Sequence, residues 1–166
     1  MMRVILLAST LAACGTWGDN RIPPQPYVQV DVEEIPYQRE WLHGSRAWEA
    51  IGFEVRHEPS YLPECDRRWY EDTADCQIIV RFVLESNLIE RTGSDGAADR
   101  GSRVVYVDDS VLEQFSEYQV ILAAHEVGHI LLDTPRHTAG GIMGASSSSM
   151  QDVDYDLACE AIGVCL

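Results

Sequence analysis

Apolar residues in the first part of the chain alternate with polar residues, then adopt a helical spacing, and then alternate again. Three valines spaced by two between Val28 and Val32 predict a strand with one buried face. From about Arg39 the apolar residues fall on one helical face, and Gly52 follows as an expected C-terminal cap. Alternation resumes around Val55, so the sequence predicts a strand, a helix and a second strand. The predicted helical face, with its tryptophans as core anchors, comprises Trp41, Ser45, Trp48 and Ile51.

The next part of the chain predicts two more strands separated by irregular segments. A charged segment lies between Cys65 and Cys76, and the strongly apolar run at 78–80 and 82–84 then fits a central strand. The segment 93–101 contains three glycines, which indicates a mobile loop. Another short strand is expected at 103–107. Together these elements indicate a mixed, twisted sheet with one backing helix.

A strongly apolar segment further along predicts a helix that is buried on several sides. Ser116 and Gln119 fit a capping box at its start, although Ser110 could begin an earlier turn. Because apolar residues cover most of the helix surface, the histidines and the glutamate at 125–129 need polar partners. The apolar positions are Ile121, Leu122, Ala124, Val127, Gly128, Leu131 and Leu132.

A final helix is expected close to the C-terminus. Ser149 and Asp152 offer a second capping box, and Gly163 closes the helix. This helix forms a short C-terminal subdomain after the sheet and the buried helix. The elements predict one small α+β domain over residues 27–166. The expected core face of the last helix comprises Val153, Leu157, Ala158, Ala161 and Ile162.

The first residues have the pattern of an export signal. A positive charge at Arg3 precedes about ten apolar or small residues, which are too few to cross a bilayer. The sequence Leu11–Cys14 resembles the lipobox at which bacterial lipoprotein signals are cleaved before a lipid-modified cysteine. The resemblance implies removal of residues 1–13, acylation of Cys14 and, because Gly15 follows, sorting to the outer membrane of the cell envelope. The alternative is an ordinary signal peptide with an incidental cysteine.

Composition and charge beyond the signal describe an exported, acidic domain. Residues 14–26 are rich in glycine and proline, and we interpret them as a flexible tether. The formal net charge of the whole chain, −15, argues against nucleic acid as a partner, because phosphates need a basic surface. The negative charge also argues against binding to anionic lipids through a basic surface, so the acyl chain on Cys14 is the expected membrane contact. We interpret the charge as solubility outside the cell rather than selection of cationic substrates, and we expect a monomer.

The remaining cysteines indicate disulfide bonds. An even number of them follows Cys14, and in an exported chain such a set predicts disulfides. Of the three possible connectivities, the local pairs Cys65–Cys76 and Cys159–Cys165 are the simplest. A thiolate zinc site is the alternative, but the sequence has no Cys-x-x-Cys spacing.

The buried helix contains the sequence His125-Glu126-Val127-Gly128-His129, which has the spacing of a hydrolytic zinc site. Histidines four residues apart lie on one helical face, so both imidazoles can reach a single metal ion. Glu126 can then accept the proton of an attacking water. A motif this short also arises by chance, so the neighbouring residues are needed to support a zinc site.

The residues that follow extend the motif. Pro135 stops the helix, and His137 then offers a third imidazole. A glycine-rich turn at 140–144 presents Met143. At this point the chain resembles the metzincin metallopeptidases, whose zinc is held by His-Glu-x-x-His and a later histidine above a methionine turn. The strand–helix–strand beginning and the late active-site helix are similar to that family's N-terminal subdomain.

The resemblance implies a small zincin domain that acts as a zinc-dependent endopeptidase with one catalytic Zn²⁺. A peptide or protein substrate is expected to lie along the edge strand of the sheet. The alternative is a non-catalytic, zinc-binding surface lipoprotein that acts as an adhesin or scaffold. The implied site comprises the metal ligands His125, His129 and His137, the general base Glu126, and Met143 as a hydrophobic base beneath the metal.

The chain departs from the family pattern between the second and third ligands. The pattern has a glycine three residues after the second histidine and the third ligand three residues later, where this chain has Leu132 and Pro135. Asp133 is a rival third ligand, because it lies four residues after His129 on the same helical face. We favour His137, because imidazole suits zinc and the methionine turn follows it.

Three other side chains are less well placed for such a site. His43 and His57 have no ligand spacing, which favours surface or packing roles. Tyr155 could reach the site as an oxyanion donor. However, no tyrosine directly follows Met143 as in some metzincins, which favours a structural role for Tyr155.

Overall fold

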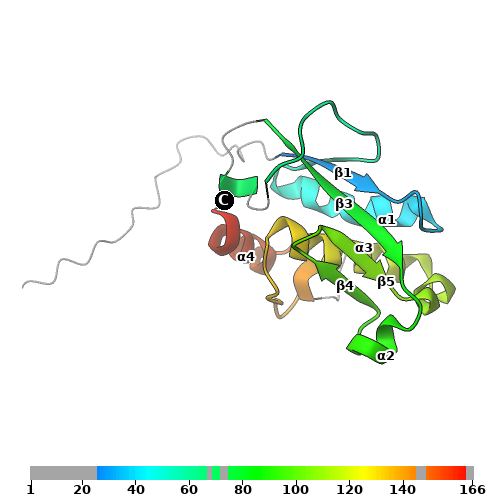
Figure 1. Ribbon diagram of the computed structural model, residues 1–166. Coiled ribbons are helices and arrows are strands. Elements are labelled where there is room, and N and C mark those ends of the chain that lie inside the picture. Colours follow the sequence, from blue (N-terminus) through cyan, green and yellow to red (C-terminus); the bar gives the residue numbers. More distant parts are fainter. Residues whose placement is uncertain (1–25, 67–68, 72–74, 145–148, 164–166) are drawn as a thin grey trace, which may run out of the picture.

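The protein is an α+β domain in which helices pack on a five-stranded mixed sheet (Figure 1). Among the residues that the structure describes, no helix is both long enough and apolar enough to cross a membrane. The predicted signal peptide at 1–13 and the lipidation site Cys14 lie outside the described residues. The computed structural model describes residues 26–66, 69–71, 75–144 and 149–163.

All described strands precede α3, which is the longest of the described helices. The strands are β1 (Tyr27–Asp31), β2 (Glu54–Arg56), β3 (Gln77–Leu84), β4 (Gly96–Asp99) and β5 (Val104–Val107). The α-helices are α1 (Gln38–Ser45), α2 (Leu88–Thr92), α3 (Ser116–Leu131) and α4 (Asp152–Ile162). Short 3-10 helices lie at Arg46–Ile51, Trp69–Glu71, Asp109–Glu113 and Ile142–Gly144.

The strand order in the sheet is β2-β1-β3-β5-β4. The pairs β1–β2, β1–β3 and β3–β5 are parallel, whereas β4 runs antiparallel to β5 at the edge. Burial alternates along β1, as its valine spacing predicts. On the central strand β3, Ile78, Val80 and Phe82 are buried, whereas the opposite face is half-buried at its apolar residues and exposed at Arg81.

Tryptophan side chains join the helices to the sheet and to each other. α1 and α3 pack together behind the sheet in the view of Figure 1. The ring of Trp41 lies 5.6 Å from that of Phe82 on β3, measured between centroids. The indole N–H of Trp48 donates to the carbonyl of Ala124 within α3 at 2.7 Å. Trp41 and Trp48 are fully buried, so the prediction that they are core anchors is confirmed.

The segment 93–101, expected to be a mobile loop, contains the edge strand β4, and that prediction was wrong. The strand pairs with β5 from Gly96 opposite Val107 to Asp99 opposite Val104. Glycine and alanine have weak strand propensity, so the sequence gives little sign of a strand there. Pairing with β5 supplies the stabilisation that the local sequence lacks.

The ends of the helices differ in part from the predictions. The helix predicted from Arg39 to Ile51 changes at Ser45 from α-helix to 3-10 helix. Gly52 ends it in the left-handed conformation with φ 97°, as predicted. α3 begins at Ser116 but lacks the expected capping box, because Phe115 occupies the cap position without a side-chain hydrogen bond.

α4 is present near the C-terminus, with a different cap and a narrower buried face than predicted. Its capping box joins Gln151 and Asp154, not Ser149 and Asp152. Val153, assigned to the core face, is 37 % exposed, because the helix turns that side towards solvent. Of the predicted core face, the buried members are Leu157 and Ala158.

The disulfide expected between Cys65 and Cys76 is present. It closes the irregular segment before β3. Cys159 in α4 is disulfide-bonded as well. Its expected partner Cys165 lies outside the described residues.

Candidate metal centre

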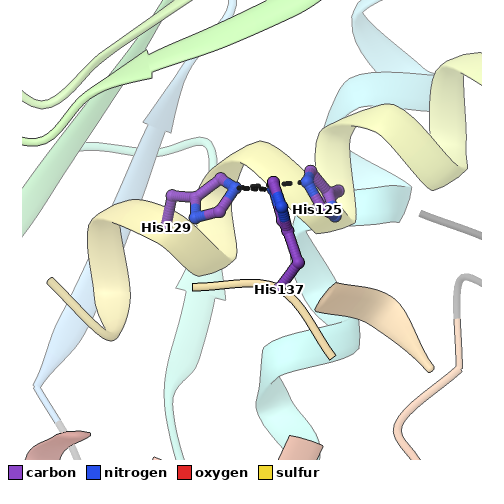
Figure 2. Close-up of side chains that lie close together, drawn as sticks. All are labelled: His125, His129 and His137. Carbon is purple, nitrogen blue, oxygen red and sulfur yellow. Dashed lines mark hydrogen bonds between the residues drawn. The ribbon is translucent and has the colours of Figure 1, made fainter. Parts of the chain in front are cut away.

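Three histidine side chains, which we call the histidine cluster, converge beside the C-terminal half of α3 (Figure 2). His125 and His129 lie four positions apart on α3, and His137 comes from the segment that follows the helix. The Nε2 atom of His129 lies 3.1 Å from Nε2 of His125 and 3.1 Å from Nε2 of His137. The three predicted ligands are therefore brought together in space.

Backbone carbonyls determine which nitrogen carries the proton in the two histidines on α3. Nδ1 of His125 lies 2.9 Å from the carbonyl oxygen of Ile142, and Nδ1 of His129 lies 2.8 Å from that of Thr134. A carbonyl only accepts, so each Nδ1 donates and each Nε2 of a neutral ring keeps its lone pair. Burial lowers the pKa of His125, and it lowers the pKa of His129 to about 4. Both rings are therefore neutral at pH 7.

This arrangement fits a zinc ion. The Nε2 atoms of His125 and His129 cannot hydrogen-bond to each other, because neither carries a proton, and a cation between them removes the repulsion of their lone pairs. Tetrahedral zinc with nitrogen ligands at about 2.0–2.1 Å needs those nitrogens roughly 3.3 Å apart, close to the observed 3.1 Å. Three imidazole ligands also leave a fourth position open, as in catalytic zinc sites.

A tight turn after α3 returns the chain to the cluster. Leu132 is the C-terminal cap of the helix, and Asp133 then adopts a left-handed conformation with φ 43°. The N–H of Thr134 donates to the carbonyl of His129 at 3.2 Å, so the turn folds back onto a predicted ligand residue. Aspartate tolerates this conformation better than most residues. The turn therefore accommodates the longer spacing before His137.

The carboxylate of Asp133 pairs with Arg100 and does not join the histidine cluster. Nη1 of Arg100 donates to the Asp133 carbonyl at 2.9 Å and to its Oδ1 at 3.2 Å. Arg100 follows β4, so this contact ties the edge strand to the turn before His137. The close group of possible ligand atoms includes His137 and not Asp133, which favours His137 as the third ligand.

Glu126 is buried beside β4 at the floor of the site. Burial raises the pKa of Glu126 to about 7, while hydrogen bonding to the backbone of Ala98 acts in the lowering direction. Gly96 makes room for the carboxyl group, because a Cβ atom there would lie 3.1 Å from Glu126 Oε1 and 2.9 Å from Leu122 Cδ1. A carboxyl group with a pKa near neutrality can both accept and return a proton.

A cleft of about 670 Å³ runs past the histidine cluster and Glu126. It is lined by residues 93–98 and Arg100, by one face of α3, and by residues of the segment 135–144. The edge strand β4, the histidine cluster and Glu126 therefore line the same cleft.

No protein-family model, curated protein or solved structure matches this chain. What the site can do therefore rests on its own residues. They supply three convergent imidazole nitrogens, a buried carboxyl group and an open cleft.

Met143 packs against α3 next to the predicted ligand His129. Its side chain is fully buried, and a Cβ atom on Gly128 would lie 2.4 Å from Met143 Sδ and 2.2 Å from Trp48 Cζ2. Gly128 directly precedes His129. The absence of a side chain at Gly128 therefore allows the turn of α3 that carries His129 to pack directly against Met143 and Trp48.

Gly128→Ala is expected to lower the free energy of unfolding by about 1–3 kcal/mol, because the added methyl group overpacks the core. Zinc affinity should fall as well, since the clash displaces the turn that carries His129. Denaturant unfolding and competition with a chromophoric chelator measure the two effects. Gly140→Ala is the matched control, because its Cβ would meet only the flexible Gln151 side chain, at 3.3 Å. Equal effects of the two substitutions would contradict this account.

A buried carboxylate from α4, which sequence reasoning missed, organises the turn that carries Met143. Asp154 has no exposed surface. Its Oδ2 accepts from the N–H of Ile142 at 2.9 Å and from that of Gln151 at 3.0 Å, and its Oδ1 accepts from the N–H of Met143 at 3.0 Å. The carbonyl of Ile142 in turn accepts from His125. Asp154 therefore positions a predicted ligand through the turn.

Asp154→Asn is expected to destabilise the fold by about 2–3 kcal/mol, because the amide group turns one acceptor oxygen into a donor that faces backbone N–H groups. The loosened turn should also weaken zinc binding through His125. Thermal unfolding and zinc titration check both effects. Asp152→Asn removes the same charge from an exposed position in the same helical turn and should change little. An unchanged zinc affinity in Asp154→Asn would show that the turn does not position His125.

The other candidate residues lie away from the cluster. His43 on α1 lines a separate surface hollow, and Nδ1 of His57 lies 3.2 Å from the carbonyl of Val30. Tyr155 packs against the core and does not line the cleft.

Proposed function

We propose that this protein is a zinc-dependent endopeptidase. The observation that carries the proposal is the convergence of three imidazole Nε2 atoms beside a buried glutamate within one open cleft. Neutral nitrogen ligands, an open coordination position and a nearby carboxylate are what metal-assisted peptide hydrolysis requires.

His125, His129 and His137 would hold the zinc ion, which would supply a Lewis acid that activates a water molecule and polarises the scissile carbonyl. The carboxylate of Glu126 accepts the proton of the attacking water and then delivers it to the leaving amine. Carbonyls of Ile142 and Thr134 hold the two α3 imidazoles in their binding orientation by accepting from Nδ1.

The sheet supports a metzincin-like relationship in the same proposal. In the described part of the chain, β4 pairs with no strand other than β5, so its other edge has no strand partner beside the cleft. An extended peptide can add to that edge by backbone hydrogen bonds. The small side chains of Gly96, Ala97 and Ala98 leave room for it. This placement would bring a scissile bond over Glu126.

We also propose that the domain is exported and tethered to the cell envelope through an acylated Cys14, as the lipobox-like sequence implies. Intact-mass analysis of the protein purified from membranes checks this. An unmodified cysteine at that position would contradict lipid anchoring while leaving the peptidase proposal intact.

A mixed peptide library tests the function. We expect cleavage by the purified domain, loss of cleavage with a chelator, and recovery on adding zinc. Sequencing the products then defines the bonds that are cut. Tight zinc binding without cleavage of any peptide would instead support the non-catalytic zinc-binding lipoprotein.

A further inference from the structure

The two ends of the cleft carry opposite charges. Asp95 directly precedes β4 and Arg100 directly follows it, and both line the cleft. Arg100 is already held by Asp133. Apart from the histidines, Arg100 is the only cationic residue among the described residues that line the cleft. The Asp95 end therefore has a carboxylate and no cation to neutralise it.

The carboxylate of Asp95 is held in place by a tyrosine on α3. The hydroxyl of Tyr118 donates to Oδ2 of Asp95, and both residues line the cleft. Burial, followed by contact with Asp95, raises the pKa of Tyr118 to about 12, so its hydroxyl stays a donor at neutral pH. A carboxylate has about four acceptor positions, and Tyr118 uses one of them. The others can accept from a ligand.

The surroundings of Asp95 suit a long cationic side chain. The neighbouring lining residues Gly93, Ser94 and Gly96 are small, whereas Leu122 and the ring of Tyr118 offer apolar surface. Lysine and arginine combine an apolar stem with a charged end, so both parts find a matching partner there. The nearest arginine in sequence outside the cleft, Arg91, is paired with Glu85.

Asp95 also lies close to the predicted point of cleavage. Its neighbour Gly96 is packed against Glu126, with the Gly96 Cβ position 3.1 Å from Glu126 Oε1. A strand advances by about 3.3 Å per residue, so Asp95 lies within roughly two substrate residues of the bond that faces Glu126.

We propose that the Asp95 end of the cleft recognises a lysine or arginine side chain next to the scissile bond, so that the substrates are basic peptides. The proposal rests on the proposed peptidase function and adds the substrate class. The overall charge of −15 contributes only by attracting cationic peptides, whereas Asp95 selects the position of the basic residue.

Matched peptides that differ at one position, with lysine, leucine or glutamate there, test the inference. The position is scanned across the residues on both sides of the cleaved bond. We expect the lysine peptide to be cleaved best at one position. Asp95→Asn should lower kcat/KM for that peptide by about 10- to 100-fold, the loss of one charge-assisted contact, and change the leucine peptide little. Asp95→Lys should reverse the preference towards glutamate.

Glu117→Gln is the matched control, because it removes one negative charge from α3 at an exposed position that does not line the cleft. It should leave the preference unchanged. Tyr118→Phe keeps the Asp95 carboxylate and should keep the sign of the preference. A lysine preference that survives in Asp95→Asn, or equal cleavage of lysine and leucine peptides at every position, would overturn the inference.

Binding to the zinc-loaded Glu126→Gln protein separates this inference from the proposed function. Calorimetry should show tighter binding of the lysine peptide than of the leucine peptide, and Asp95→Asn in the same background should remove the difference. If no peptide is cleaved by the wild-type protein but this difference is found, the recognition site stands and the peptidase proposal fails. If binding shows no difference, the recognition site fails whatever the activity.

Discussion

Glu126→Gln is expected to abolish peptide hydrolysis while zinc stays bound. Glutamine keeps the size of the buried side chain but cannot accept a proton from the attacking water. Loss of a positioned general base lowers kcat/KM by about 10³-fold or more. The predicted ligand nitrogens belong to other residues, so zinc content measured by elemental analysis should match that of the wild-type protein.

Glu117→Gln is also the control for charge in this experiment. Glu117 lies on the same helix, is exposed, and lines a separate surface hollow. Its substitution should leave both zinc content and hydrolysis unchanged. Retained hydrolysis in a zinc-loaded Glu126→Gln protein would remove Glu126 from its proposed role.

His137→Ala should weaken zinc binding more than any substitution at Asp133. Removing one of three imidazole ligands leaves only the pair on α3, and we expect the zinc affinity to fall by more than about 100-fold, beyond the loss typical of residues that merely support ligands. Asp133→Asn should keep zinc affinity within about tenfold, because asparagine also tolerates the left-handed conformation of the turn. Competition titration with a chelator measures both affinities.

The ion pair between Asp133 and Arg100 predicts that Asp133→Asn affects stability and zinc affinity differently. Asp133→Asn weakens the ion pair at 3.2 Å, so a modest loss of stability is expected even where zinc binding survives. Thermal unfolding of the metal-free protein separates the two effects. If Asp133→Asn loses zinc and His137→Ala retains it, the third ligand is Asp133.

Much of the site's geometry follows from the sequence because it depends on one helix. The period of an α-helix places residues four apart on the same face, so the proximity of His125 and His129 needs no tertiary information. The apolar residues around them also predict that α3 is buried, and most of the helix is. The position of His137 depends on the turn at Asp133, whose left-handed conformation no local pattern announces.

The edge strand and the supporting carboxylate could not be found in the same way. β4 is built from residues with weak strand propensity and is stabilised by its pairing with β5, the next strand along the chain, so the composition of the segment does not indicate a strand. Asp154 occupies the N3 position of α4, where an acidic residue usually signals a helix cap. Its additional hydrogen bonds to Ile142 and Met143 depend on how α4 packs against the preceding turn.

The turn at Asp133 bears on how related sites are recognised in other sequences. His137 follows His129 by eight positions, because one left-handed residue anchored by Arg100 takes up the extra length. A search pattern that requires a glycine after the second histidine and a fixed interval to the third would pass over this chain. A pattern that allows aspartate or asparagine at the turn, and requires an arginine just after the edge strand, would find this chain.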